Sequence, residues 1–349
     1  MQSNLQLLAV VSILAMSSEI ASAMDKPITI KAVGTWGNLT HYQKHEGPFW
    51  NELITSVSDG QIIGDIKPQT ELGLKGFEIM RLVKNGVFDF AFGLPSYIAV
   101  ENAVFEGGDL SSVTQDINTE RKVAEAYFPI LERAFAKIYN AKLLMLYPQG
   151  SQTLLCNAEV NDLADLKGRK IRVYSTTLGD FVEGVGGISV TIPFAEAIPA
   201  LERGVVDCGI TGTMSAYKAK WHQVATHAYT LRVGWALAFG AMNMTKWNSI
   251  SSHQQTLLIK EIDALSNRMW AETAIEDEIA ISCITGGKCA IGESGTMKLV
   301  KPSNDDLAVR DKIANDVILA RWAKRCGAEC AETWNKTVGS ILGLKAEVK

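Results

Sequence analysis

The chain is poor in the residues and motifs that most hydrolases and nucleotide-binding enzymes require. It has five histidines, none in an H-E-x-x-H motif, and no G-x-S-x-G, Walker or dinucleotide-binding glycine motif. His41 and His45 stand four residues apart and could bind a metal, but such a pair at a helix start is more often solvated. We therefore expect no metal, no cofactor and no catalytic residues.

An excess of charge of one sign is also lacking, as are long hydrophobic runs beyond the N-terminus. The net charge is −4 with acids and bases interspersed, which argues against a nucleic-acid-binding surface. The apolar run Leu7–Met16 is too short to cross a bilayer, and the small residues Ala21-Ser22-Ala23 follow it. Residues 1–23 therefore predict a signal peptide cleaved after Ala23, although no Lys or Arg precedes the apolar run. We expect a soluble, exported mature chain.

Six cysteines become informative in an exported chain. Cys283 and Cys289 flank a glycine turn, and Cys326 and Cys330 flank a three-residue segment, so both pairs predict disulfides in an oxidising compartment. Zinc is the competing interpretation, but neither pair has the C-x₂-C spacing and no histidine lies near either. The remaining two cysteines lie in apolar strand sequences and predict buried free thiols: Cys156 and Cys208.

The first half of the mature chain alternates between strand and helix patterns. The predicted strands are Ile28–Val33, Ile62–Ile66, Phe88–Gly93 and Ala141–Tyr147. The predicted helices are His41–Ser56, Glu71–Lys84 and Glu120–Tyr139. This alternation predicts an α/β fold in which helices cover the faces of a parallel sheet.

The segment Asp162–Thr213 repeats this alternation. Strand patterns at Lys170–Tyr174, Ser189–Ile192 and Val205–Val206 alternate with helix patterns at Leu178–Val185 and Phe194–Leu201. Ligands of such sheets bind outside the carboxyl ends of the strands. Arg172 lies inside the first of these strands and is a candidate carboxylate clamp, because a guanidinium matches a carboxylate bidentately. The alternative from the pattern alone is a surface arginine paired with an acid at a strand edge.

The same segment resembles a known family. The runs "DLKGRKIRV" and "GGISVTIPFAEAIPALERGVVD" are similar to the core of the DctP-type solute receptors of tripartite ATP-independent periplasmic (TRAP) transporters. The resemblance is dense over about fifty residues and keeps its order and spacing across the mature chain. In this family the arginine of the K-[IV]-R-V strand binds the ligand's carboxylate, and Arg172 occupies that position.

The resemblance implies a two-lobed periplasmic clamshell with parallel or mixed sheets. The chain would cross between the lobes more than once, with hinge strands near Thr153–Asn157 and Leu237–Asn243. The pattern around Asn243–Trp247 predicts a strand that returns to the first lobe, and a helix without Gly or Pro follows it. The expected parts are lobe 1 (24–150, with a return at about 237–260), lobe 2 (151–236, with parts of about 270–310), a spanning helix (251–283) and a C-terminal helical segment (305–349).

Two positions depart from the family pattern and bear on the ligand. Gln152 stands where many relatives have an arginine, and Thr211 replaces an asparagine that holds the carboxylate with the arginine. A second ligand charge would therefore be buried without a cation, which disfavours a dicarboxylate such as succinate.

Other candidates follow strand ends. Glu71 would open a helix and face the cleft, or simply be stabilised by that helix's N-terminus. Four aromatic side chains could stack on a planar or apolar ligand, although about half of them are expected only to cover the core. These are Trp36, Tyr174, Tyr217 and Trp235.

We therefore expect a binding protein and no enzyme. The resemblance implies a periplasmic receptor that delivers an organic acid to the small and large integral membrane subunits of a TRAP transporter. The ligand would be a monocarboxylate with an apolar or aromatic body. The alternatives are a subunit that reports ligand occupancy to a membrane sensor and, less favoured, an exported hydrolase.

Overall fold

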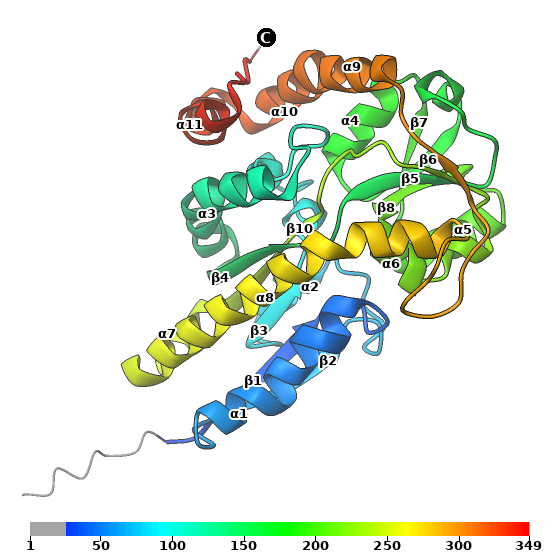
Figure 1. Cartoon of the computed structure of the whole chain (residues 1–349). Helices are drawn as coiled ribbons and strands as arrows, with labels where there is room; N and C mark the ends of the chain where they lie inside the picture. Colours follow the sequence, from blue (N-terminus) through cyan, green and yellow to red (C-terminus); the bar gives the residue numbers. More distant parts are fainter. Residues whose placement is uncertain (1–25, 349) are drawn as a thin grey trace, which may run out of the picture.

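The structure, a computed structural model, describes residues 26–348. The predicted signal peptide lies outside these residues. Among residues 26–348, no helix combines the length and apolar character that a membrane span requires. The described chain folds around two mixed sheets, each of which carries helices on its faces, so the predicted α/β class is confirmed (Figure 1).

The first sheet forms the first lobe. Its strands are ordered β2 (Ile62–Pro68), β1 (Ile28–Gly34), β3 (Phe90–Gly93), β10 (Leu237–Asn243) and β4 (Ala141–Pro148). Strands β1, β2 and β3 are parallel, and β10 runs antiparallel to β3 and β4. Its helical elements are two π-helical turns (Tyr42–Glu46 and Phe49–Leu53), α1 (Ile54–Val57), α2 (Ile79–Lys84), α3 (Ile117–Tyr139) and α7 (Met244–Ser249).

The second sheet forms the second lobe. Its order is β11 (Lys298–Val300), β9 (His227–Tyr229), β5 (Gln152–Cys156), β8 (Cys208–Gly212), β6 (Lys170–Val173) and β7 (Ile188–Thr191). Strand β6 is parallel to β7 and β8, whereas β5 is antiparallel to β8 and β9. Helices α4 (Thr176–Gly184), α5 (Phe194–Glu202) and α6 (Thr213–Lys218) belong to this lobe.

The chain passes between the two sheets from β4 to β5 and again from β9 to β10. These two connections run side by side. The Gln149 N–H donates to the Ala236 carbonyl at 3.1 Å, and the Gln152 N–H donates to the Gly234 carbonyl at 2.8 Å. The Asp109 carboxylate accepts the backbone N–H of Leu237 at 2.9 Å, which ties the second connection to the first lobe. The lobes are therefore joined through a hydrogen-bonded pair of strand-like connections.

The long helix α8 (Ser252–Ile284) contacts both lobes. Ser251 caps it through a hydrogen bond with the Gln254 N–H. Its Thr273 hydroxyl lies 3.2 Å from the His41 ring in the first lobe. Further along the helix, the Asp277 carboxylate accepts from the Thr213 hydroxyl at 2.8 Å in the second lobe. Figure 1 shows α8, in yellow, extending from β4 to α6.

The C-terminal helices also contact helices of both lobes. They are α9 (Asn304–Ile313), α10 (Leu319–Cys326), α11 (Ala328–Trp334) and α12 (Ser340–Leu342). Helix α9 packs on α4, and the helical turn Asn335–Gly339 packs on α3. Figure 1 shows these helices, in orange and red, lying over both of those elements.

Three predicted elements are wrong in whole or in part. The helix predicted over Glu71–Lys84 forms only from Ile79 onward as α2, because Gly73 and Gly76 have φ angles of 68° and 102°. The return strand at Asn243–Trp247 is wrong, because the Asn243 side chain accepts the Lys246 N–H at 3.0 Å and starts α7. The strand predicted at Val205–Val206 begins at Cys208 instead.

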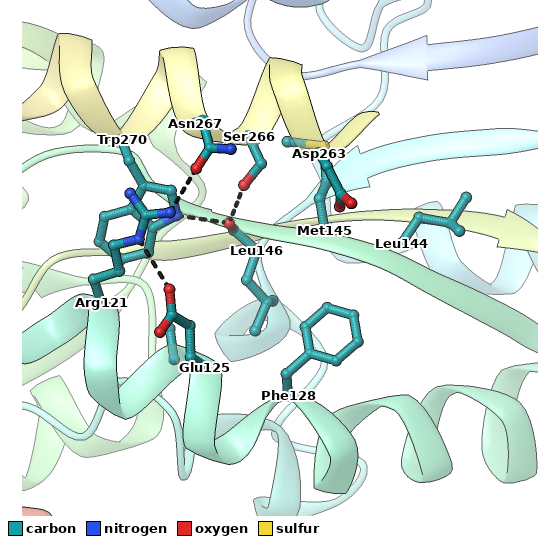
Figure 2. A pocket seen from close by; sticks show the side chains of 11 residues that line it. Arg121, Glu125, Phe128, Leu144, Met145, Leu146, Asp263, Ser266, Asn267 and Trp270 are labelled. Atoms are coloured by element: carbon teal, nitrogen blue, oxygen red, sulfur yellow. Dashed lines mark hydrogen bonds and ion pairs between the residues drawn. The ribbon is translucent and has the colours of Figure 1, made fainter. Parts of the chain in front are cut away.

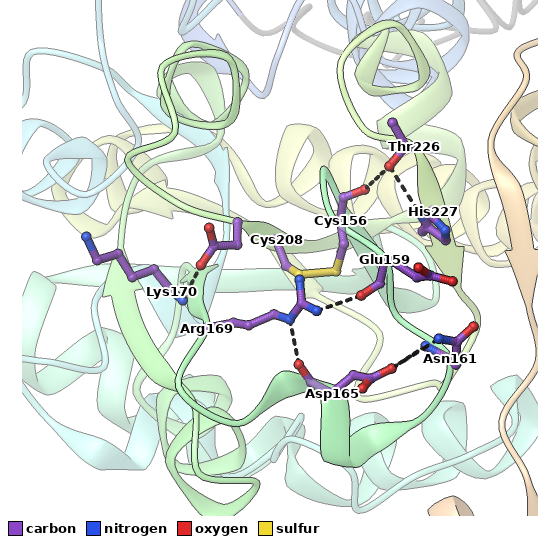
Figure 3. Close-up of a disulfide and its surroundings, with 10 residues drawn as sticks. Cys156, Glu159, Asn161, Asp165, Arg169, Lys170, Cys208, Thr226 and His227 are labelled. Atoms are coloured by element: carbon purple, nitrogen blue, oxygen red, sulfur yellow. Dashed lines mark hydrogen bonds between the residues drawn. A yellow bond between two sulfur atoms is a disulfide. The ribbon is translucent and has the colours of Figure 1, made fainter.

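Three disulfides are present among residues 26–348. Cys283–Cys289 and Cys326–Cys330 are paired as predicted. The prediction of free thiols at Cys156 and Cys208 is wrong. The two residues face each other on the antiparallel strands β5 and β8 and form a disulfide across 52 residues of sequence (Figure 3).

Three glutamates are buried, and of these Glu106 lies 3.8 Å from the Arg325 guanidinium. Burial raises the pKa of Glu46, Glu106 and Glu276 to about 7 in each case. Their ordinary pKa is 4.5, so the folded protein holds these protons more tightly than the unfolded chain. Burial lowers the pKa of His41 to about 3, so this histidine begins to oppose the glutamates as the pH falls toward its ordinary pKa of 6.5.

These buried groups predict that the protein becomes more stable as the pH falls from about 8 to about 6.5. The stabilisation from the raised glutamate pKa values is complete below pH 4.5 and is lost as the pH rises through 7. Over the stated window we expect a gain of about 2 kcal/mol in the free energy of unfolding, measured by urea denaturation. Glu276→Gln should stabilise the protein at about pH 8 and make the stability less dependent on pH. A wild-type stability that rises with pH over this window would contradict the argument.

Candidate functional site

Arg172 lies inside the second sheet, where its backbone strand has partners on both sides. It is the third residue of β6 and pairs with Val190 of β7 and Gly209 of β8. Its Nε donates to the Ile192 carbonyl at 2.9 Å, and its Nη1 donates to the Ile210 carbonyl at 2.7 Å. These two bonds fix the plane of the guanidinium.

The Arg172 guanidinium is buried and incompletely paired. The residue is 1% exposed, and its Nη2 has no hydrogen-bond partner within residues 26–348. Burial lowers the pKa of Arg172, but a guanidinium stays protonated in proteins. A buried cation without a counter-charge is unfavourable, so a ligand carboxylate at Nη2 would be strongly favoured.

Four aromatic side chains from the two lobes surround this cation. Trp36 and Tyr97 come from the first lobe, and Tyr174 and Phe194 come from the second. The Trp36 ring centre lies 5.2 Å from that of Phe194 and 6.0 Å from that of Tyr97, in edge-to-face geometry. The Arg172 Cζ lies 5.3 Å from the centre of the Tyr174 ring. The Tyr97 hydroxyl accepts the Phe194 N–H at 3.3 Å across the lobes.

The enclosed space is small and has a few polar groups. The cavity volume is about 20 Å³, which is room for about one water molecule. The lobes or their side chains must therefore part before an organic acid can enter. The full lining is Trp36, Leu39, Leu94, Tyr97, Gln149, Gln152, Arg172, Tyr174, Phe194, Thr211, Gly212, Ser215 and Ala236.

The structure brings together five of the eight candidate residues named from the sequence. These five are Arg172, Gln152, Thr211, Trp36 and Tyr174. The other three do not line this cavity. Glu71 is exposed in the turn after β2, whereas the Trp235 ring lies 4.7 Å from the Arg232 Cζ. The Tyr217 ring stacks on His222 at 5.2 Å, and its hydroxyl donates to the Glu293 carbonyl at 3.0 Å.

Sequence reasoning missed several lining residues, of which Tyr97, Phe194 and Gln149 matter most for the chemistry. Tyr97 follows the carboxyl end of β3 and Gln149 follows that of β4, so strand ends carried a signal. Phe194 opens α5 inside the family-like segment. Their roles depend on the approach of the two lobes, which spacing along the chain does not give.

A larger groove of about 330 Å³ lies between α3 and α8 at the edge strand β4 (Figure 2). Its arginine is already paired: the Arg121 Nε donates to Glu125 at 3.0 Å and its Nη2 donates to Asn267 at 2.5 Å. The Trp270 indole likewise donates to the Leu146 carbonyl at 2.9 Å. The cleft at Arg172 is therefore the better candidate for anion binding.

Residues 34–308 match the DctP model, described as bacterial extracellular solute-binding protein, family 7. The chain belongs to this family. The DctP fold therefore accounts for the two lobes around Arg172. Members of the family are receptors for solutes, so the protein is a solute-binding protein and not an enzyme.

Similar proteins agree with this assignment across the whole DctP fold. The chain is 23% identical to the C4-dicarboxylate-binding periplasmic protein DctP of Rhodobacter capsulatus, and the match covers 93% of each chain. A TRAP periplasmic solute-binding protein of Desulfovibrio salexigens with bound orotic acid superposes with a TM-score of 0.80 at 17% identity, covering 90% of this chain and 99% of that one. DctP7 of Bordetella pertussis, an extracytoplasmic solute receptor binding pyroglutamic acid, superposes with a TM-score of 0.77 at 18% identity. The superposition covers 89% of this chain and 99% of that one.

Proposed function

We propose that this protein is the periplasmic receptor of a TRAP transporter and captures a small organic acid through the Arg172 guanidinium. The observation that carries the proposal is the buried Nη2 of Arg172, which has no partner within residues 26–348. A carboxylate would supply the missing charge and hydrogen bond together. The loaded receptor would then deliver the acid to the membrane subunits of the transporter.

The lining favours an acid with one carboxylate and a flat body. Arg172 is the sole charged side chain among the residues that line the cavity. A second carboxylate would therefore be desolvated there without a cation. The rings of Trp36, Tyr97, Tyr174 and Phe194 offer surfaces for a planar ligand. Orotic and pyroglutamic acids, which similar proteins bind, are rings that carry a single carboxyl group.

Closure provides the mechanism of capture. The Tyr97 hydroxyl and the Phe194 N–H join the two lobes directly over the cleft, and Trp36 packs against Phe194. A ligand that contacts Arg172 on one lobe and Trp36 or Tyr97 on the other would stabilise the closed form over the open form. Excluding water would at the same time strengthen the ion pair at Arg172.

A thermal-shift panel tests this ligand class. Aromatic and heterocyclic monocarboxylates, at concentrations well above their dissociation constants, should raise the melting temperature by several degrees. C4-dicarboxylates should leave it nearly unchanged, because their second carboxylate would be buried without a cation. Stabilisation by succinate and none by the ring monoacids would remove the proposed ligand class and leave the receptor assignment intact.

A further inference from the structure

A buried carboxylate lies behind the cleft and controls a chain of hydrogen bonds that ends at the cavity wall. Glu46 is fully buried. Its Oε2 accepts the Thr35 N–H at 2.7 Å, and its Oε1 accepts the Thr35 hydroxyl at 2.8 Å and the Tyr147 hydroxyl at 2.9 Å. An ionised carboxylate accepts hydrogen bonds and donates none. The Tyr147 hydrogen is therefore directed to Glu46.

This direction determines what Tyr147 offers to its other neighbour. With its hydrogen engaged, the phenolic oxygen can only accept, and the Gln149 Nε2 lies 3.5 Å from it. The opposite orientation of the Gln149 amide would place its oxygen against the Tyr147 oxygen with no hydrogen between them. Glu46 thus selects the orientation in which the Gln149 nitrogen faces Tyr147.

The consequence appears in the cleft. Gln149 lines the same small cavity as Arg172, and its Oε1 is buried without a hydrogen-bond partner among residues 26–348. A buried acceptor without a donor is costly, so a ligand that supplies an N–H or O–H to it gains affinity over one that does not. The second glutamine of the cavity also has its nitrogen engaged, because the Gln152 Nε2 donates to the Gly150 carbonyl at 2.8 Å.

We propose that Glu46, acting through Tyr147, orients Gln149 as an acceptor and makes the receptor select monocarboxylates that also carry an N–H or O–H donor. This inference rests on the proposed capture of an organic acid at Arg172. Glu46 and Tyr147 are positioning residues in it, and Gln149 contacts the ligand. The selected class comprises acids such as ring carboxylates with a ring N–H.

Two acids of nearly equal shape test the inference by isothermal titration calorimetry. Pyrrole-2-carboxylate presents a ring N–H where furan-2-carboxylate presents a ring oxygen. At about pH 8.5 Glu46 is ionised, since burial raises its pKa to about 7. The wild-type protein should bind the pyrrole acid at least about tenfold more tightly than the furan acid.

The isosteric variant Glu46→Gln should abolish or reverse this preference. Its amide nitrogen would donate toward Tyr147, whose hydroxyl would then be released to donate to the Gln149 oxygen, and the Gln149 nitrogen would face the cleft. Glu276→Gln makes the same change at another buried glutamate, whose carboxylate has no hydrogen bond to Thr35, Tyr147 or Gln149 among residues 26–348. This variant should keep the wild-type ratio of the two affinities. Tyr147→Phe removes the hydroxyl that links Glu46 to Gln149. It should therefore lower the ratio of the affinities for the pyrrole and furan acids, as Glu46→Gln does.

The outcomes separate the inference from the proposed function. Equal affinity of the wild-type protein for both acids, or an unchanged ratio in Glu46→Gln, overturns the role of Glu46 and leaves the receptor for organic acids standing. If Glu46→Gln does not fold, the wild-type ratio and the Tyr147→Phe ratio still decide. If neither ring acid binds, both the inference and the proposed ligand class fail.

Discussion

Replacing Arg172 with alanine should weaken the binding of organic acids by more than about thirtyfold. The expected size follows from removing one partner of a desolvated charge pair, which costs a few kcal/mol. The loss should fall mainly on the dissociation rate, because the guanidinium acts after the cleft has closed. Calorimetry with an acid that stabilises the wild-type protein would measure it.

The Arg172→Lys variant distinguishes a clamp from a simple positive charge. The Arg172 guanidinium already donates to the carbonyls of Ile192 and Ile210, and its Nη2 remains available for the ligand. An ammonium group cannot reproduce this fork. We therefore expect Arg172→Lys to bind more weakly than the wild-type protein but more tightly than Arg172→Ala.

Arg169→Ala is the matched control for both variants. Arg169 lies three residues earlier, and its guanidinium bonds to the carbonyls of Asp165 and Glu159 on the side of the Cys156–Cys208 disulfide (Figure 3). Its loss should leave acid binding unchanged. A wild-type dissociation constant in Arg172→Ala would remove the clamp from the mechanism.

The sequence predicted best those features that depend on residues close to one another along the chain. Arg172 lies in a short strand whose β-rich run is recognisable, whereas Gln152 and Thr211 were identified from the family pattern. The Cys283–Cys289 and Cys326–Cys330 pairs were also predictable, because their members are only six and four positions apart in the sequence. Nearness along the chain made the predictions of Arg172 and of these two disulfides possible.

The rest depends on strand register and on the approach of the lobes. Pairing of Cys156 with Cys208 requires β5 to lie antiparallel to β8 in one particular register, and sequence spacing does not specify it. Glu46 is similar, since its sequence neighbours resemble those of an exposed glutamate in a helix. It is the contact with Tyr147, 101 residues away, that buries it beside the cleft. Tyr97 and Phe194 line the cleft together although 97 positions separate them in the sequence, and spacing does not predict this contact.

The Cys156–Cys208 disulfide should contribute about 2–4 kcal/mol to the free energy of unfolding, and Cys326–Cys330 should contribute less. Both cysteines of the first pair are fully buried, and their disulfide closes a loop of 52 residues, whereas the second closes a loop of four. In the chain-entropy account, the longer loop restricts the unfolded chain more. Strand β8 also supplies the Ile210 carbonyl that holds Arg172, so the stabilised strand pair supports the ligand site.

Variants that retain a single disulfide isolate this contribution from side-chain packing. In the first, the other four cysteines become alanine and Cys156–Cys208 remains. In the second, Cys326–Cys330 remains. Urea unfolding of each variant at equilibrium, with and without dithiothreitol, compares oxidised and reduced chains that have identical side chains. The reductant should lower the unfolding free energy by about 2–4 kcal/mol in the first variant and by less in the second. Equal losses in both would contradict the loop-length argument, because they would show that closing 52 residues restricts the unfolded chain no more than closing four.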